Sequence, residues 1–278
     1  KHCRSRAERG GRGERRSEGA RERQRCGVSA SGAPVMALDL AQTIGWIGTG
    51  LTMLWFASPA ATFRSIARNK SVGSFDSTPY LMTLLQCILW LSYAVVTPDR
   101  FIVLITNVLG AALELLWCLL YLRYADEKRK MATNLFLVCI FWASATVLDK
   151  AWASRLPMKP LKSGESMDTE ALGIICVLAN VLSYAAPLGV FRQVIRTKSV
   201  ASMPLGLSLA ATCSSCCWCI YAILMRDMWV LTPNLGGVIL GMVQLTLYAI
   251  YCRGPASAEV CDGRASTVRL QGAGRLLP

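Results

Sequence analysis

The sequence predicts an all-α membrane protein with seven transmembrane helices, built as two parallel three-helix bundles joined by a linker helix (3+1+3). Three observations predict this fold class. The 278 residues are 53% hydrophobic and only 17% charged, whereas soluble domains carry about 25% charged residues. The charges are separated from long apolar runs. A basic decapeptide also occurs twice, as FRSIARNKSV at 63–72 and FRQVIRTKSV at 191–200.

The first 35 residues differ in composition from the rest of the chain. Residues 1–25 contain ten Lys or Arg and four Glu, with almost no apolar side chains, so residues 1–35 are expected to be disordered. Met36 stands directly before the first apolar run. We interpret 1–35 as an upstream stretch that the working protein does not need. The alternative is a nucleic-acid-binding or lipid-binding arm; otherwise no nucleic-acid partner is expected.

Seven charge-poor runs predict the helices in order. At about 1.5 Å per residue, a run of roughly 18 to 25 residues crosses a hydrocarbon core of about 30 Å. The first run is longer than the apolar core of a secretory signal, so we expect a retained helix. The runs lie at 40–63, 78–97, 101–122, 131–148, 171–191, 203–225 and 228–252. They group into a first repeat (40–125), a linker helix (131–149) and a second repeat (170–252), followed by a disordered cytosolic tail (253–278).

The repeat extends over three helices in each copy. With the linker helix between the copies, equivalent positions are separated by four membrane crossings, so both copies point the same way. Lys and Arg number eleven in the loops on one side and six on the other, which predicts a first helix that begins outside and a cytosolic tail. The pairs of equivalent residues include Pro79 and Pro204, Trp90 and Trp218, Tyr93 and Tyr221, Asn107 and Asn234, and Gly110 and Gly237.

Four linked segments resemble the SWEET (MtN3/saliva) family of sugar transporters, and the resemblance covers about residues 44–252. It implies a bidirectional sugar uniporter that works by alternating access and assembles as a homo-oligomer in the lipid bilayer. No cofactor is expected. We expect the plasma membrane, with an endomembrane as the alternative. The segments are ASPAATFRSIARNKSVGSFDSTPYLMTLLQCILWLSYA, LITNVLGAALELLW, YAAPLGVFRQVIRTKSVASMP and LTPNLGGVILGMVQLTLYAIY.

Four duplicated side chains form the core of the predicted sugar site. Asn107 and Asn234 lie near the middle of the third helix of each copy, and an amide offers two donors and an acceptor to sugar hydroxyls. Trp90 and Trp218, in the second helices, can place an apolar ring face against a pyranose. Taken singly, each Asn could make an interhelical hydrogen bond instead, and each Trp could pack or lie at the membrane interface. Their recurrence in both copies favours a pocket.

The resemblance adds the residues seven and four positions before the prolines of the first and fifth helices. These residues are Thr52 and Trp55 in the first copy, and Asn180 and Ser183 in the second. Trp55 departs from the family's disaccharide carriers, which tend to have a small residue there. Because a large ring would shrink the cavity, we expect a hexose substrate.

Candidate gates lie at the two ends of the helices. Proline removes a backbone hydrogen bond and loosens a helix, and four prolines near the cytosolic ends resemble the family's proline tetrad, which would supply the hinges of an inner gate. The alternative is that a proline simply begins or ends a helix, and this applies above all to Pro79 and Pro204. At the outer ends, the resemblance implies a closing hydrogen bond between Tyr93 and Asp227; the alternative is a solvated Asp227. The prolines are Pro59, Pro79, Pro187 and Pro204.

Glu114 is an acid within an apolar run, and such a residue is a functional hypothesis by default. We expect a structural partner for it, with proton coupling as the alternative. The segment CSSCCWC at 213–219 has no His nearby, so we expect these cysteines to pack and not to bind a metal.

Other classes of protein fit the sequence less well. The sole His is His2, and there is no Ser/His/Asp set, HExxH motif or phosphate loop, so an enzyme is not expected. A heptahelical receptor does not need a duplicated three-helix unit. The nearest rival is a proton-coupled exporter of amino acids or other small solutes from the PQ-loop group. However, Pro59 and Pro187 are followed by Ala60 and Leu188, not by Gln.

Overall fold

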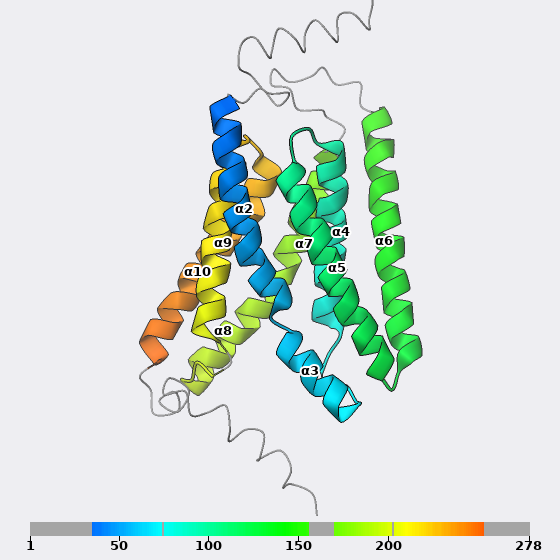
Figure 1. Ribbon diagram of the computed structural model, residues 1–278, viewed down its shortest axis with the longest axis vertical. Helices are drawn as coiled ribbons and strands as arrows, with labels where there is room; N and C mark the ends of the chain where they lie inside the picture. Colours follow the sequence, from blue (N-terminus) through cyan, green and yellow to red (C-terminus); the bar gives the residue numbers. More distant parts are fainter. Residues whose placement is uncertain (1–34, 74, 156–169, 202, 253–278) are drawn as a thin grey trace, which may run out of the picture.

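The computed structural model describes residues 35–73, 75–155, 170–201 and 203–252, and within these ranges the regular structure is helical (Figure 1). The arm up to residue 34 and the tail 253–278 lie outside the described residues. The first half of the fold holds α2 (Val35–Ala57), α3 (Ala60–Asn69), α4 (Thr78–Val96) and α5 (Phe101–Tyr124). The second half, after α6 (Lys128–Arg155), holds α7 (Glu170–Ser183), α8 (Ala185–Thr197), α9 (Leu205–Leu224) and α10 (Met228–Tyr251).

Six helical segments of the described chain are long and apolar enough to cross a membrane: α4, α5, α6, α7 together with α8, α9 and α10. The remaining long helix, α2, has 23 residues and packs along α9 and α5. It therefore belongs to the same bundle as the six apolar segments. The all-helical class that the sequence predicts is confirmed.

The first and fifth predicted helices are each interrupted, and a proline explains each break. Pro59 has no N–H to donate to the carbonyl of Trp55, and Ser58 N donates to that carbonyl instead at 3.0 Å. Pro187 likewise cannot donate to the carbonyl of Ser183, and α7 ends at Ser183. The single helices predicted over 40–63 and 171–191 are therefore corrected to the pairs α2–α3 and α7–α8.

The repeated decapeptides form α3 and α8 together with the turn that follows each helix. The first copy buries Phe63 and Val72, and the Phe63 ring stacks on Trp117 of α5 at 5.0 Å. The second copy buries Phe191 and Val200, and α8 packs on α10. The Arg and Lys side chains of both copies are exposed. The repeat is therefore a structural unit, a short amphipathic helix fixed to the third helix of its half with its cations outside.

The helices of the two repeats close into a ring. Within the first half α5 lies between α2 and α4, and within the second half α10 lies between α7 and α9. The halves are joined twice, by packing of α2 on α9 and of α4 on α7. Helix α6 lies outside this ring, against α4, α5 and α7 (Figure 1). Equivalent helices occupy equivalent places, as a parallel repeat requires.

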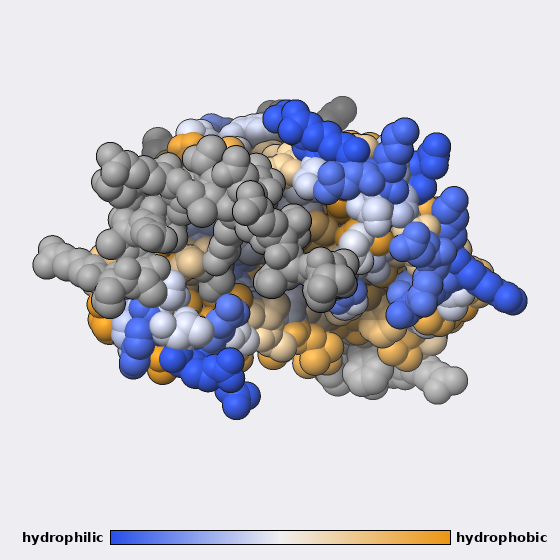
Figure 2. Space-filling view, turned by 90° about the horizontal axis from the view of Figure 1, so that it is seen from below, coloured by the Kyte–Doolittle hydropathy of each residue, from blue (hydrophilic) through white to orange (hydrophobic). Residues whose placement is uncertain are grey.

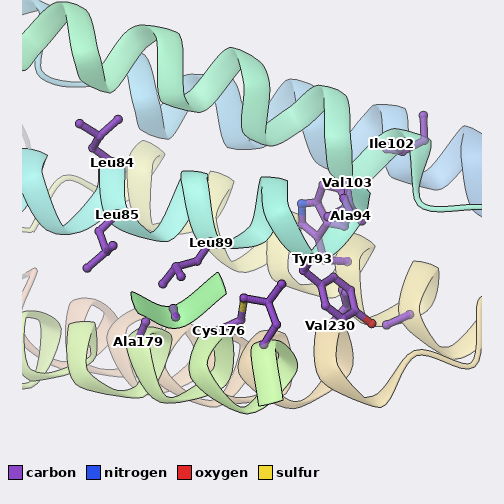
Figure 3. Packing of buried hydrophobic residues seen from close by; sticks show 14 of the residues in the cluster. Leu84, Leu85, Leu89, Tyr93, Ala94, Ile102, Val103, Cys176, Ala179 and Val230 are labelled. Carbon is purple, nitrogen blue, oxygen red and sulfur yellow. The ribbon is translucent and has the colours of Figure 1, made fainter. Parts of the chain in front are cut away.

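The main hydrophobic core includes the seam between α4 and α7. Leu85 and Leu89 of α4 face Cys176 and Ala179 of α7 (Figure 3). Leu89 and Cys176 are fully buried, and burying a leucine side chain contributes about 1.5–3 kcal/mol. Tyr93 follows on α4, one turn further along the same seam. This packing places the Tyr93 hydroxyl at the boundary between the two halves.

The linker helix α6 is fixed to both halves. Trp142 Nε1 donates to Ser92 Oγ of α4 at 2.8 Å. Asp149 is buried and accepts a hydrogen bond from Leu172 N, in the first turn of α7, at 3.0 Å. The Asp149 carboxylate thus satisfies one of the free N–H groups at a helix start. These two contacts hold the α4–α7 seam from outside the ring.

Candidate functional site

A buried ionic cluster joins the two halves at one end of the ring. Tyr93 Oη donates to both carboxylate oxygens of Asp227, at 2.9 and 3.0 Å. Arg100 Nε donates to Asp227 Oδ2 at 2.6 Å. Asp227 also accepts from Val230 N at 3.0 Å, in the first turn of α10. Because Asp227 is only 2% exposed, the alternative of a solvated Asp227 is wrong.

Arg100 and Asp227 occupy corresponding positions in the two halves. Arg100 precedes α5 and Asp227 precedes α10, and these are the third helices of the two repeats. The tyrosines correspond as well, but Tyr221 has a buried hydroxyl with no hydrogen-bond partner among the described residues. The sequence reading missed Arg100 and counted it only as a loop charge. Superposing the two copies would have placed these opposite charges at matching sites.

The contact between α2 and α9 brings together two of the predicted site residues. Trp218 Nε1 donates to Thr52 Oγ1 at 3.1 Å, and Thr52 Oγ1 lies 2.8 Å from Ser214 Oγ. Ser214 also donates to the carbonyl of Gly48 at 3.3 Å. Gly48 permits this close approach, because a Cβ there would lie 3.2 Å from Cys217 Cβ. Thr52 and Trp218 therefore form one polar group across the boundary between the halves.

The second contact between the halves has a different polar group. Gln86 Nε2 of α4 donates to Ser183 Oγ at 2.6 Å and to the carbonyl of Ala179 at 3.0 Å. Gln86 stands where the second copy has Ser214, four residues before the duplicated Trp. The sequence reading named Ser183 but missed Gln86 and Ser214. The signal was a polar residue at the same position of each apolar helix.

The two asparagines have the same geometry in both halves. Asn107 Nδ2 donates to the carbonyl of Val103, and Asn234 Nδ2 donates to the carbonyl of Val230, both at 2.8 Å. Both bonds lie within one helix, so the interhelical bond considered as an alternative is not seen. The side-chain oxygens of both asparagines have no hydrogen-bond partner within the described ranges. Asn180 follows the same pattern, with Nδ2 donating to the carbonyl of Cys176 at 2.9 Å.

The duplicated tryptophans pack on the duplicated tyrosines. The Trp90 and Tyr93 rings meet edge to face with centroids 5.4 Å apart, and Trp218 and Tyr221 repeat this contact at 5.4 Å. Trp90 thus packs directly on a member of the buried ionic cluster. Trp55, near the end of α2, is 49% exposed. It follows Thr52 by three residues and therefore shares a helix face with it.

The four prolines stand at junctions between helices. Pro59 and Pro204 directly precede α3 and α9, Pro79 lies in the first turn of α4, and Pro187 lies in the first turn of α8. Pro79 and Pro204 therefore lie at the beginnings of helices, which is the alternative role considered for them. All four belong to the end of the ring opposite the buried ionic cluster, where α3 and α8 diverge (Figure 1).

Glu114 is 3% exposed and lies inside the first half, close enough to Tyr80 and Cys87 of α4 for electrostatic interaction. Its Oε2 atom has no hydrogen-bond partner in the described part of the chain. The structural partner expected from the sequence is therefore not seen for this oxygen. The cysteines of 213–219 lie on α9, and the described residues contain no group of three His, Cys, Asp or Glu suited to a metal ion.

Two parallel three-helix halves, joined by one helix and closed across their boundary by polar side chains, define a multi-pass membrane carrier. The chain belongs to the SWEET (MtN3/saliva) family. The family profile described as "Sugar efflux transporter for intercellular exchange" matches residues 42–129 and 170–256.

Relatives and a solved structure agree with this assignment. The chain is 35% identical over 228 residues to "Bidirectional sugar transporter N3" of Medicago truncatula. This match covers 81% of this chain and 82% of the relative. It is 36% identical over 209 residues to SWEET15 of Oryza sativa subsp. indica, covering 75% of this chain and 63% of the relative. A solved structure of a eukaryotic SWEET transporter superposes with a TM-score of 0.69 at 32% identity, over 78% of this chain and 98% of that chain. The 3+1+3 membrane fold is thereby confirmed.

Proposed function

We propose that this protein is a bidirectional, facilitative sugar transporter that works by alternating access. The buried Tyr93–Arg100–Asp227 cluster carries the proposal, because it ties two parallel halves together at one end through hydrogen bonds and an ion pair. Alternating access needs such a closure at one end and hinges at the other. The prolines at the opposite helix junctions fit the second requirement. The names of the relatives support sugars as the substrate class.

We assign the substrate site to the duplicated residues at and near the boundary between the halves. The side-chain oxygens of Asn107 and Asn234, which have no partner among the described residues, are suited to accept hydrogen bonds from sugar hydroxyls. The rings of Trp90 and Trp218 supply apolar faces for a pyranose. Uncharged partners of this kind suit an uncharged substrate. The other residues of the proposed site are Thr52, Trp55, Asn180 and Ser183.

We propose hexoses as the main substrates because of Trp55. Its large, half-exposed ring takes up space on the face of α2 that also carries Thr52. The experiment is uptake of labelled glucose, fructose and sucrose into vesicles that contain the purified protein. Trp55→Val should raise sucrose uptake relative to glucose uptake. Trp46→Val is the matched control, since Trp46 is equally exposed on the opposite face of α2; sucrose carried as well as glucose by the parent protein would refute the hexose assignment.

The membrane orientation belongs to the same proposal. We place the ionic cluster outside the cell and the ends that carry α3 and α8 in the cytosol, because Lys and Arg concentrate on the α3 and α8 side. We also propose the plasma membrane and a homo-oligomer. Accessibility of an epitope placed after residue 252 tests the orientation, and cross-linking in intact membranes tests the assembly.

One observation favours a second candidate, proton-coupled export of a small solute. Glu114 Oε2 is buried and has no hydrogen-bond partner in the part of the chain that the structure describes, and a carboxyl group in a membrane interior can bind and release protons. Against this, Glu114 lies within the first half and not between the halves, and the second copy has Gly241 there. Uptake measured with and without a pH gradient separates the two candidates.

A further inference from the structure

We propose that the first half carries a binding pocket for the phosphate monoester of an anionic lipid headgroup, where α3, α5 and α6 meet. The pocket has a volume of about 350 Å³ and is lined by Lys70, Arg123, Tyr124, Ala125, Asp126 and Lys128. This proposal does not depend on which solute the protein carries.

The pocket lies where three helices end or begin. Lys70 directly follows α3 in the left-handed backbone region, with φ 53°. Arg123 lies in the last turn of α5, and Lys128 begins α6. These helix ends lie together at one end of the molecule (Figure 1), and hydrophilic residues gather there in the view from below (Figure 2). The ends of membrane-spanning helices are at the level of lipid headgroups.

The charge at this position favours an anion. Three cations line the pocket with one acid, Asp126. The neighbouring acid Glu127 is 3.5 Å from Lys130. Helix α6 starts with Lys128, Arg129 and Lys130 and has no acid in its first turn. Because a helix N-terminus carries partial positive charge, cations there are unfavourable and an anion is stabilised.

The second half shows that the corresponding lysine can be used differently. Lys198 also has a left-handed backbone, with φ 54°. It donates to Tyr251 Oη at 3.1 Å and lies 4.8 Å from the centroid of that ring. In the first half, Arg123 lies over the corresponding Tyr124 at 5.6 Å. Lys70 makes no hydrogen bond or ion pair within the described ranges, so its ammonium group is available to a ligand.

The chemistry of the lining selects a phosphate monoester on a lipid. A guanidinium group binds phosphate oxygens in pairs, and basic pockets beside helix ends on one membrane surface suit phosphorylated headgroups. A phosphodiester with choline brings its own cation, which the three basic side chains would repel. An apolar anchor stands nearby. Phe75 is 48% exposed, and its carbonyl accepts a hydrogen bond from Tyr121, one turn before Tyr124.

Binding of short-chain lipids to the purified full chain in an uncharged detergent tests the proposal. The probes are dioctanoyl phosphatidic acid, dioctanoyl phosphatidylcholine and glycerol 3-phosphate, with affinity measured by thermophoresis. Phosphatidic acid should bind saturably and at least about tenfold more tightly than either other probe. Each lost cation should weaken binding about fivefold, so the combined Lys70→Gln, Arg123→Gln and Lys128→Gln variant should lose on the order of 100-fold.

Lys198→Gln is the matched control and should bind phosphatidic acid like the parent. Lys70→Gln alone, at an exposed position, provides a second measurement that does not depend on the combined variant folding. Affinity unchanged in Lys70→Gln, or reduced equally in Lys198→Gln, would overturn the pocket. Equal affinity for glycerol 3-phosphate would overturn the lipid as the source of the phosphate.

Discussion

Arg100 and Asp227 form a 2.6 Å ion pair between the two halves, with side chains only 5% and 1% exposed. Asp227→Ala would leave the Arg100 charge buried and unpaired, which costs about 3–5 kcal/mol. We expect a lower unfolding temperature of the purified protein and reduced sugar uptake. Adding Arg100→Met to Asp227→Ala should restore most of the stability, because no charge then remains buried. Equal unfolding temperatures for the single and double variants would contradict this account.

The two tyrosines offer a matched pair of variants. Tyr93→Phe removes the hydroxyl that binds the Asp227 carboxylate, and a hydrogen bond to a charged group contributes about 1.5–3 kcal/mol. The end of the ring that the ionic cluster closes should therefore open more often, by about 10-fold to 150-fold. Hydrogen exchange of the backbone at 93–100 and 225–231 should accelerate. Tyr221→Phe removes a hydroxyl that has no partner among the described residues and should leave this exchange unchanged. Faster exchange in both variants would exclude a specific role for Tyr93.

Asn107→Ala and Asn234→Ala test the proposed sugar site. Each removes donors and an acceptor, and a sugar hydroxyl left without its partner costs about 1–3 kcal/mol, or roughly a 5-fold to 150-fold loss of affinity. Stability should change little, since each amide bonds only within its own helix among the described residues. Calorimetric titration of the purified variants measures the affinity. Thr232→Ala, an exposed residue with the same kind of bond on α10, is the control.

Parental affinity in both asparagine variants, together with earlier melting, would place the sugar site elsewhere. The earlier melting would then mean that the amides serve to stabilise the bundle.

Replacing Gly110 by alanine and replacing Gly50 by alanine should change the stability of the protein in opposite directions. A Cβ at Gly110 would lie 2.5 Å from Phe56 Cε2 and 2.8 Å from Cys87 Sγ, and such overpacking costs about 1–3 kcal/mol. At Gly50, no atom of the described residues lies within 4 Å of that position, and an alanine in a helix interior is favoured by about 0.5–1 kcal/mol. Thermal unfolding of the two variants checks both signs. An unchanged Gly110→Ala would show that α5 is free to shift away from α2.

Proton coupling is tested by dissipating the pH gradient during sugar uptake. A facilitative transporter needs no group that binds and releases protons in its cycle, so the flux should not change. Glu114→Gln should transport like the parent and melt at the same or a higher temperature, because it removes an acid whose buried Oε2 has no partner among the residues that the structure describes. A flux that collapses with the gradient, together with an inactive Glu114→Gln, would favour the proton-coupled exporter.

The fold could be predicted because membrane-spanning helices have a characteristic sequence pattern. Long runs without charge define the spans, and the duplicated decapeptide reveals two copies with the same orientation. The exact position of the break between α7 and α8 was harder to predict from the sequence. Pro187 indicates it, but the helix ends at Ser183 because the carbonyl that loses its donor lies four residues earlier.

The candidate site could be predicted only in part. Duplication identified Asn107 and Asn234, since both copies keep the same amide. A search for identical residues in the two copies did not identify Gln86 and Ser214, because one copy has an amide and the other a hydroxyl at this position, although both residues bridge the halves. Arg100 was missed for the same reason, because its counterpart has the opposite charge. Comparing the two copies identifies the residues that they have in common. The contacts across the boundary between the halves also depend on positions where the copies have different residues.

The matching places of Arg100 and Asp227 bear on how the molecule arose. Two identical copies related by a two-fold axis would set like charges against each other at this point, either two arginines or two aspartates, and the pair would repel. Attraction at this point requires that the two copies carry different residues. The ion pair therefore requires two copies that differ at this position, and a chain that holds both copies can keep such an asymmetric contact at the axis that relates them.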